Sequence, residues 1–84
     1  MISSEQCRAA RILVGMSAND LAKRAEVGIA TIKRFESGQT VNLVSQALIE
    51  RALVAAGIAF IAPGDRSVEG GEGVRLAPIP PEGW

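Results

Sequence analysis

Residues 17–39 read SANDLAKRAEVGIATIKRFESGQ, and this stretch decides the fold. Ser17 can cap a helix, and Asp20 three residues later completes a capping box with the shorter acid. The apolar residues that follow recur at helical spacing: Leu21, Ala22 and Ala25. The pattern therefore predicts a helix over about residues 18–25.

A second helix is predicted over about residues 29–37, directly after a short connection. Gly28 can cap its start, and the pair Ser37-Gly38 is typical of a helix C-terminus. Its inward-facing residues are Ile32 and Phe35. The connection from Ala25 to Gly28 has room for a tight turn only. Two short helices joined in this way form a helix-turn-helix, whose second helix can lie in the DNA major groove.

Two further helices flank this pair, so the sequence predicts four. In the first, Ser4 can act as the cap, and Gly15 ends the helix in the left-handed conformation. In the last and longest, Asn42 can act as the cap, and the helix extends through Ala56 to Gly57. The apolar stripe of the first helix is Cys7, Ala10, Leu13 and Val14, and that of the last is Leu48, Ile49, Ala52, Leu53 and Ala56.

The chain changes character after these helices. All four prolines and five of the nine glycines lie after Ala62. A strand is predicted over 58–62, a weaker strand over 73–77, a flexible loop over 66–72 and polyproline II over 78–81. The predicted fold class is therefore all-α: a bundle of four helices with a short C-terminal β element and a Pro/Gly-rich tail. The corresponding parts of the chain are a helical domain over 1–57, a β dimerisation element with its loop over 58–77 and an extended tail over 78–84.

Composition excludes several classes of protein. The chain has 84 residues, of which 48% are hydrophobic, and a formal net charge of zero, so it can form one small globular domain. It contains no histidine and a single cysteine, Cys7. The sequence therefore lacks the histidine and cysteine ligands of a zinc site, the second cysteine of an internal disulfide and the histidine that would activate a nucleophile. We expect no enzymatic activity, no metal and no cofactor, and we expect Cys7 to pack in the core as a small hydrophobe.

The location of the protein follows from what the sequence lacks. It shows no secretory signal, and its longest uncharged apolar run, residues 52–62, is too short to span a membrane. We therefore expect a cytoplasmic protein without membrane contact. Charge divides along the chain: residues 1–62 carry seven basic against five acidic residues, or +2, and residues 63–84 carry two against four, or −2.

The chain resembles the phage lambda repressor and Cro type of regulator, also called XRE-type, in two segments: SANDLAKRA at 17–25 and TIKRFESGQ at 31–39. The resemblance covers residues 6–57. Its most specific pieces are the Ser-x-x-Asp-Leu-Ala start, the Thr-Ile-x-Arg-Phe-Glu-Ser-Gly end and the spacing between them. The resemblance implies a lambda-repressor-like helical bundle. It also implies a homodimeric transcriptional regulator of double-stranded DNA, with repression as the expected mode.

The resemblance also implies which residues meet DNA. Base contacts are expected from Ile29, Ala30, Thr31, Lys33 and Arg34. Phosphate contacts are expected at a helix start and in the loop after the recognition helix, because exposed backbone amides attract anions: these residues are Ser17, Ala18, Asn19, Ser37, Gln39 and Thr40. Arg34 is the best candidate for bidentate recognition of guanine, and Lys33 can serve a base or a phosphate. The alternatives are that Lys33 and Arg34 form a solvated helix face and that Ser17 only caps.

The resemblance further implies a partly buried ion pair between Arg11 and Glu36, which orients the recognition helix. The chain also departs from the family at three positions. Glu26 stands where the turn usually has Gly, Gly28 stands where Ser or Thr usually caps, and Ile29 stands where a polar or basic residue is frequent. The last two departures weaken direct base readout, and an exposed Ile29 would offer a protein contact instead.

A dimer is expected because a single helix-turn-helix makes few contacts, and half-sites are usually read about one DNA turn apart, roughly 34 Å. The apolar density of residues 53–62 exceeds what four small helices can cover, which suggests the place of the interface. The strand over 58–62 pairs either with 73–77 in a hairpin or with the same strand of a second subunit. The predicted interface residues are Leu53, Ile58, Phe60 and Ile61.

A second hypothesis belongs to a different class. The chain could be an antitoxin-like protein or another interaction module, which keeps the fold as a scaffold and binds a protein partner through its C-terminal tail. The pI of about 6.2 is low for a dedicated nucleic-acid binder, although the positive surplus lies in the helical part. Charge therefore separates the two hypotheses only weakly.

Overall fold

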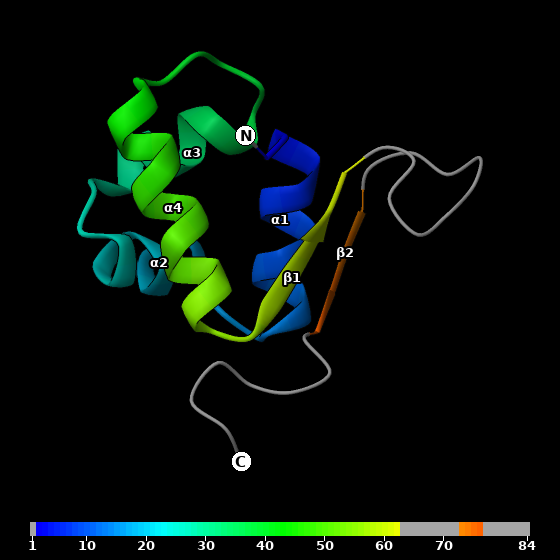
Figure 1. The fold of residues 1–84 in the computed structure, drawn as a ribbon. Helices are drawn as coiled ribbons and strands as arrows, with labels where there is room; N and C mark the ends of the chain where they lie inside the picture. Colours follow the sequence, from blue (N-terminus) through cyan, green and yellow to red (C-terminus); the bar gives the residue numbers. More distant parts are fainter. Residues whose placement is uncertain (1, 63–72, 77–84) are drawn as a thin grey trace.

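The computed structural model describes residues 2–62 and 73–76 and contains four helices followed by two strands (Figure 1). In chain order these elements are α1 (Ser4–Leu13), α2 (Ala18–Ala25), α3 (Ile29–Glu36), α4 (Leu43–Ala55), β1 (Ile58–Ile61) and β2 (Gly73–Leu76). The predicted fold class, a helical bundle with a short C-terminal β element, is confirmed. The predicted loop over 66–72 and tail over 78–84 lie outside the described residues.

The helix ends follow local signals in the sequence. The hydroxyl of Ser17 accepts a hydrogen bond from the backbone N–H of Asp20 at 3.0 Å, and the Asp20 carboxylate accepts one from the Ser17 N–H at 3.0 Å. This is the capping box predicted for α2. Asn42 caps α4 by accepting a backbone N–H at 2.7 Å. Gly15 and Gly57 have φ angles of 72° and 102°, which lets the chain leave α1 and α4 without strain.

The start of α1 differs from the prediction, because Ser3 rather than Ser4 is the cap. The Ser3 hydroxyl accepts from the Gln6 backbone N–H at 3.1 Å, and the Gln6 side-chain oxygen accepts from the Ser3 N–H at 2.8 Å. A glutamine completes a capping box only with a cap three residues before it, which selects Ser3. The buried Gln6 side chain also donates to the carbonyls of Gly73 at 2.8 Å and Ile61 at 3.3 Å. One side chain therefore caps α1 and holds the two strands against it.

The core lies where the four helices meet, and the strands close one side of it. In Figure 1, α4 crosses in front of α2 and α3, and the two strands lie beside α1. β1 and β2 are antiparallel, with Ile58 opposite Leu76 and Phe60 opposite Val74. The strand at 58–62 thus pairs within its own chain, which was one of the two predicted alternatives. The largest fully buried side chains are Cys7, Leu21, Ile32, Ile49 and Leu53.

Two of the residues predicted to form a dimer interface belong instead to the core of a single chain. Leu53 is 0% exposed and Ile58 is 2% exposed, so neither presents a surface to a second copy. The prediction is wrong for these two residues because Leu53 faces inward from α4 together with Ile49, and Ile58 lies at the start of β1, which packs against α4. Phe60 and Ile61 are half-buried. Leu13, which was placed on the inward stripe of its helix, is exposed at the end of α1.

Candidate nucleic-acid interface

The turn between α2 and α3 fixes the angle between the two helices of the motif. Glu26 lies in the left-handed region, with φ 58° and ψ 43°. The following residue, Val27, donates its N–H to the carbonyl of Ala22 at 3.0 Å, and Gly28 then caps α3 without a side-chain hydrogen bond. Glu26 therefore adopts the backbone that glycine reaches freely, at a cost of about 1 kcal/mol for a residue with a Cβ.

Arg11 and Glu36 tie α3 to α1. The Nε of Arg11 donates to Oε2 of Glu36 at 2.9 Å, and its Nη2 donates to Oε1 at 3.1 Å, which is a bidentate pair. The remaining nitrogen, Nη1, donates to the carbonyl of Met16 at 3.1 Å. The hydrogen bond to Glu36 raises the pKa of Arg11, so the guanidinium stays charged. The pair that the resemblance implied is thus present, and it holds the C-terminal end of α3 in place.

The thiol of Cys7 belongs to the same cluster. Cys7 is fully buried, and its Sγ donates to Oε2 of Glu36 at 3.4 Å. Burial, and then the negative charge of Glu36, raises the pKa of Cys7 to about 12. The thiol is therefore protonated near neutral pH and acts as a donor rather than as a nucleophile. Sequence reasoning placed Cys7 in the core but missed its hydrogen bond, because the partner lies on another helix.

The outward face of α3 is short and positively charged. Its exposed residues are Ala30, Lys33 and Arg34. Spacing of three and four residues places them on one side of the helix, opposite the buried Ile32 and Phe35. The only acidic residue of α3, Glu36, is held by Arg11. The face therefore carries two cations, and α3 itself has no free carboxylate to compete with DNA for them.

Two predicted base-contact residues lie at the edge of this face. Thr31 and Ile29 are both half-buried, and Ile29 packs against the core. Ile29 precedes Ile32 by three residues and so shares its inward side. Part of the Ile29 side chain is thus unavailable to a thymine methyl group. The candidates that face outward are Ala30, Lys33 and Arg34, with Thr31 beside them.

The start of α2 offers backbone amides to a phosphate, but a carboxylate lies among them. Ser17 and Asn19 are exposed and Ala18 is half exposed. The Asp20 carboxylate already accepts the Ser17 N–H, and this hydrogen bond lowers the pKa of Asp20. Asp20 is therefore ionised at neutral pH. Its charge opposes the attraction that the amides of Ala18 and Asn19 exert on an anion.

The loop after α3 holds the other predicted phosphate contacts. The Ser37 hydroxyl donates to the carbonyl of Arg34 at 2.9 Å, and the Gln39 N–H donates to the same carbonyl at 2.9 Å. The hydroxyl proton of Ser37 is therefore used within the loop. The side chains of Gln39 and Thr40 are exposed, and the next residue, Val41, is buried and anchors the loop. Gln39 and Thr40 are thus presented close to the last turn of α3.

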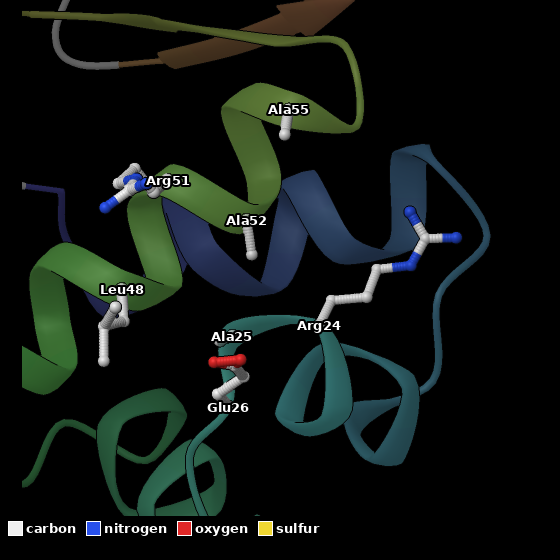
Figure 2. A pocket seen from close by; sticks show the side chains of 7 residues that line it. All are labelled: Arg24, Ala25, Glu26, Leu48, Arg51, Ala52 and Ala55. Atoms are coloured by element: carbon white, nitrogen blue, oxygen red, sulfur yellow. The ribbon is translucent and has the colours of Figure 1, made fainter.

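An open pocket of about 340 Å³ lies between the end of α2 and α4 (Figure 2). The residues that line it are Arg24, Ala25, Glu26, Leu48, Arg51, Ala52 and Ala55. Figure 2 shows the side chains of Arg24 and Arg51 pointing away from one another, so the two charges do not converge on one ligand position. None of the residues predicted to contact DNA lines this pocket. It is therefore separate from the candidate interface.

Comparisons with known proteins agree with this geometry at the level of the motif. The chain matches a family model described as a helix-turn-helix domain over residues 5–59, which is more than half of its length. The match extends from the first turn of α1 into β1. No curated protein matches the chain. Among the described residues, the structure has no helix with the length and apolar character needed to cross a membrane.

Proposed function

The chain belongs to the helix-turn-helix domain family, and from this premise we propose that it is a transcriptional regulator of the lambda repressor and Cro (XRE) type. In this proposal it binds double-stranded DNA as a homodimer, with α3 in the major groove. Bound to its operator, it represses by occluding a promoter. It acts in the cytoplasm, where the DNA is, and it has neither catalytic activity nor a cofactor.

The observation that carries the proposal is the exposed cationic face of α3. Lys33 and Arg34 lie beside the small Ala30, which allows the helix axis to approach the base edges. Arg34 can form a bidentate pair with guanine, and Lys33 can contact a base or a phosphate. The pair between Arg11 and Glu36 supports this role, because a recognition helix must keep its orientation when it enters the groove.

Charge around this face favours modest affinity. The exposed charged residues of α2, the turn and α3 are Lys23, Arg24, Lys33, Arg34, Asp20 and Glu26. Four cations against two carboxylates give the exposed residues of these three segments a net charge of +2 in each chain, although the whole chain has a formal net charge of zero. Neutralisation of DNA phosphates supplies most nonspecific affinity, so a surplus of two positive charges gives weak nonspecific binding. We propose that base contacts and dimerisation supply the additional affinity for the operator.

Selection from a random duplex library tests the proposal. The expected result is enrichment of a motif with two related halves, whose centres lie about 10 base pairs apart. This result would support DNA recognition and two-fold symmetry together. No enrichment at about 50 mM salt, where nonspecific attraction is strong, would contradict the proposal.

A second candidate function is favoured by a different observation. Leu43 and Val44 are exposed although both are apolar, and they lie on α4 rather than on α3. Such residues are typical of a protein contact. An antitoxin-like or scaffold role would use this surface, or the C-terminal tail, to bind a protein of another kind. Failure of the DNA selection together with a stable heteromeric complex would favour this candidate.

A further inference from the structure

The outward side of α4 is an apolar surface that nothing in the described chain covers. Leu43 and Val44 are each 70% exposed and Val54 is 42% exposed, and Ala47 and Ala55 are exposed as well. The inward side of the same helix is also apolar. Exposed apolar residues that lie together are typical of a protein contact. The outward side of α4 therefore offers apolar surface to a partner, beside the charged side chains of Glu50 and Arg51.

This surface contains a hollow of a defined kind. An open depression of about 280 Å³ is lined by Ala47, Glu50, Arg51 and Val54. These residues are spaced i, i+3, i+4 and i+7, which is the arrangement of four side chains that receives one side chain from a facing helix. Ala47 is small, so a second helix axis can approach closely. The hollow thus fits a large aliphatic side chain carried by another helix.

We propose that the partner is a second copy of the chain, and that the two α4 helices pack antiparallel about a two-fold axis next to Ala47. In this arrangement Leu43 of each copy enters the hollow of the other. Leu43 lies about one turn before Ala47, and the hollow is centred about one turn after it. A two-fold axis at Ala47 therefore brings each Leu43 opposite a hollow, and a single surface supplies both halves of the contact.

Charge does not oppose this arrangement. Glu50 and Arg51 both line the hollow, so in the antiparallel pair a carboxylate and a guanidinium both lie near the first turn of the other α4. The helix N-terminus attracts the carboxylate and repels the guanidinium, so the two effects offset one another. The orientation is set by shape: in a parallel pair each Leu43 would lie beside the other Leu43 rather than opposite a hollow.

The size of the contact sets its strength. A helix of 13 residues is about 20 Å long and about 10 Å wide, so this face buries less than the roughly 800 Å² per partner of a typical stable complex. We therefore expect a dissociation constant of about 10 to about 100 µM in solution. The biological role of this interface rests on the proposed function, in which the chain binds DNA as a homodimer. Two adjacent half-sites would raise the local concentration of the two copies, so a weak interface is sufficient on DNA.

Sedimentation velocity over about 5 to about 500 µM of the full chain tests the interface. The wild-type chain is expected to pass from monomer to dimer within this range. Ala47→Glu places a charge on the axis and is expected to remain monomeric. Ile12→Glu is the matched control, because Ile12 is 69% exposed on α1, away from this face, and it should dimerise like the wild type. Far-UV circular dichroism checks that both variants keep the helical fold.

Cysteine crosslinking gives an independent readout. Position 47 lies on the proposed axis, so Ala47→Cys should form a disulfide between two copies under mild oxidation, whereas Ile12→Cys should not. Cys7 does not compete, because it is buried. A wild-type chain that stays monomeric throughout, an Ala47→Glu variant that dimerises normally, or equal crosslinking of the two cysteine variants would each overturn the inference.

DNA binding is measured separately, so that the two proposals can fail separately. A wild-type dimer that ignores DNA would overturn the regulator proposal and leave this interface standing. A chain that binds operator DNA but never associates through α4 would overturn the interface alone.

Discussion

Glu36 accepts hydrogen bonds from both Arg11 and Cys7, at 2.9 Å and 3.4 Å to the same Oε2 atom. One carboxylate of α3 therefore satisfies two groups of α1. The side chains of Arg11 and Glu36 are 19% and 10% exposed, so little water is available to replace either partner. The orientation of α3 depends on this cluster.

Glu36→Gln is expected to destabilise the fold by about 2 to 4 kcal/mol, because it leaves the Arg11 guanidinium largely buried and without its counter-charge. Urea unfolding followed by circular dichroism measures the effect. Glu5→Gln is the control, because Glu5 is an exposed acid of α1, and its midpoint should remain near that of the wild type. Equal midpoints for the two variants would show that the ion pair does not hold α3.

Alkaline pH is expected to weaken the fold through Cys7. Its pKa is raised from 9.0 to about 12 in the folded chain, so the folded state favours the protonated thiol. This contribution is complete below about pH 9 and is lost as the pH rises from about 9 towards about 12, by at most about 1.4 kcal/mol per pH unit. The measurement compares urea midpoints at pH 8 and pH 10.5 for the wild type and Cys7→Ala.

The wild type should lose more stability over this interval than Cys7→Ala, because the other titrating groups are common to both chains. The native thiol should also react slowly with a thiol reagent at pH 8, since it is buried and protonated. The same pH dependence in both chains, or rapid labelling of the folded protein, would contradict the placement of Cys7.

Glu26→Gly is expected to stabilise the chain by about 0.5 to 1 kcal/mol, because Glu26 holds a φ of 58° that glycine adopts without steric cost. Glu26→Ala is the matched control. It removes the same carboxylate but retains a Cβ, so it should give no comparable gain. Thermal unfolding of the three chains distinguishes strain from charge, and equal gains for glycine and alanine would attribute the effect to the carboxylate.

Asp20→Asn is expected to tighten nonspecific DNA binding about two- to fivefold at low salt, although it weakens the cap of α2. The reason is that Asp20 holds a negative charge among the amides predicted to meet a phosphate. Fluorescence anisotropy with a labelled duplex measures the change, and Glu5→Gln should leave the affinity unchanged. Weaker or unaltered binding by Asp20→Asn would show that no DNA phosphate lies at the start of α2.

The helices of the motif could be predicted from sequence because their signals are local. The capping box of Ser17 and Asp20 and the cap position of Gly28 lie within three residues of the bonds that they control. The cap of α1 was misplaced by one residue because Ser3 and Ser4 are adjacent and both can cap. The distance from Ser3 to Gln6 distinguishes them, so this signal was present in the sequence.

Other features depend on contacts between distant residues and could not be predicted. The burial of Ile58 depends on β1 folding back against α4, and the bond between Cys7 and Glu36 spans 29 positions. Ile29 lies between the two faces of a short helix, so helical periodicity alone did not settle its burial. The outward surface of α4 was missed for another reason: apolar residues also lie outside the inward stripe of this helix, so hydrophobic patterning did not separate its exposed side from its buried side.

The central claim is that the outward face of α3 contacts the bases of DNA. The most direct test measures two properties of three single variants: their preference for the selected operator and the salt dependence of their binding. Arg34→Ala should abolish the preference for the selected operator over random duplex, and Lys33→Ala should mainly make the slope of log affinity against log salt shallower by about 1. Arg8→Ala, which removes an exposed cation from α1, should do neither. An operator preference that survives Arg34→Ala, or one that is lost equally with Arg8→Ala, would contradict the account.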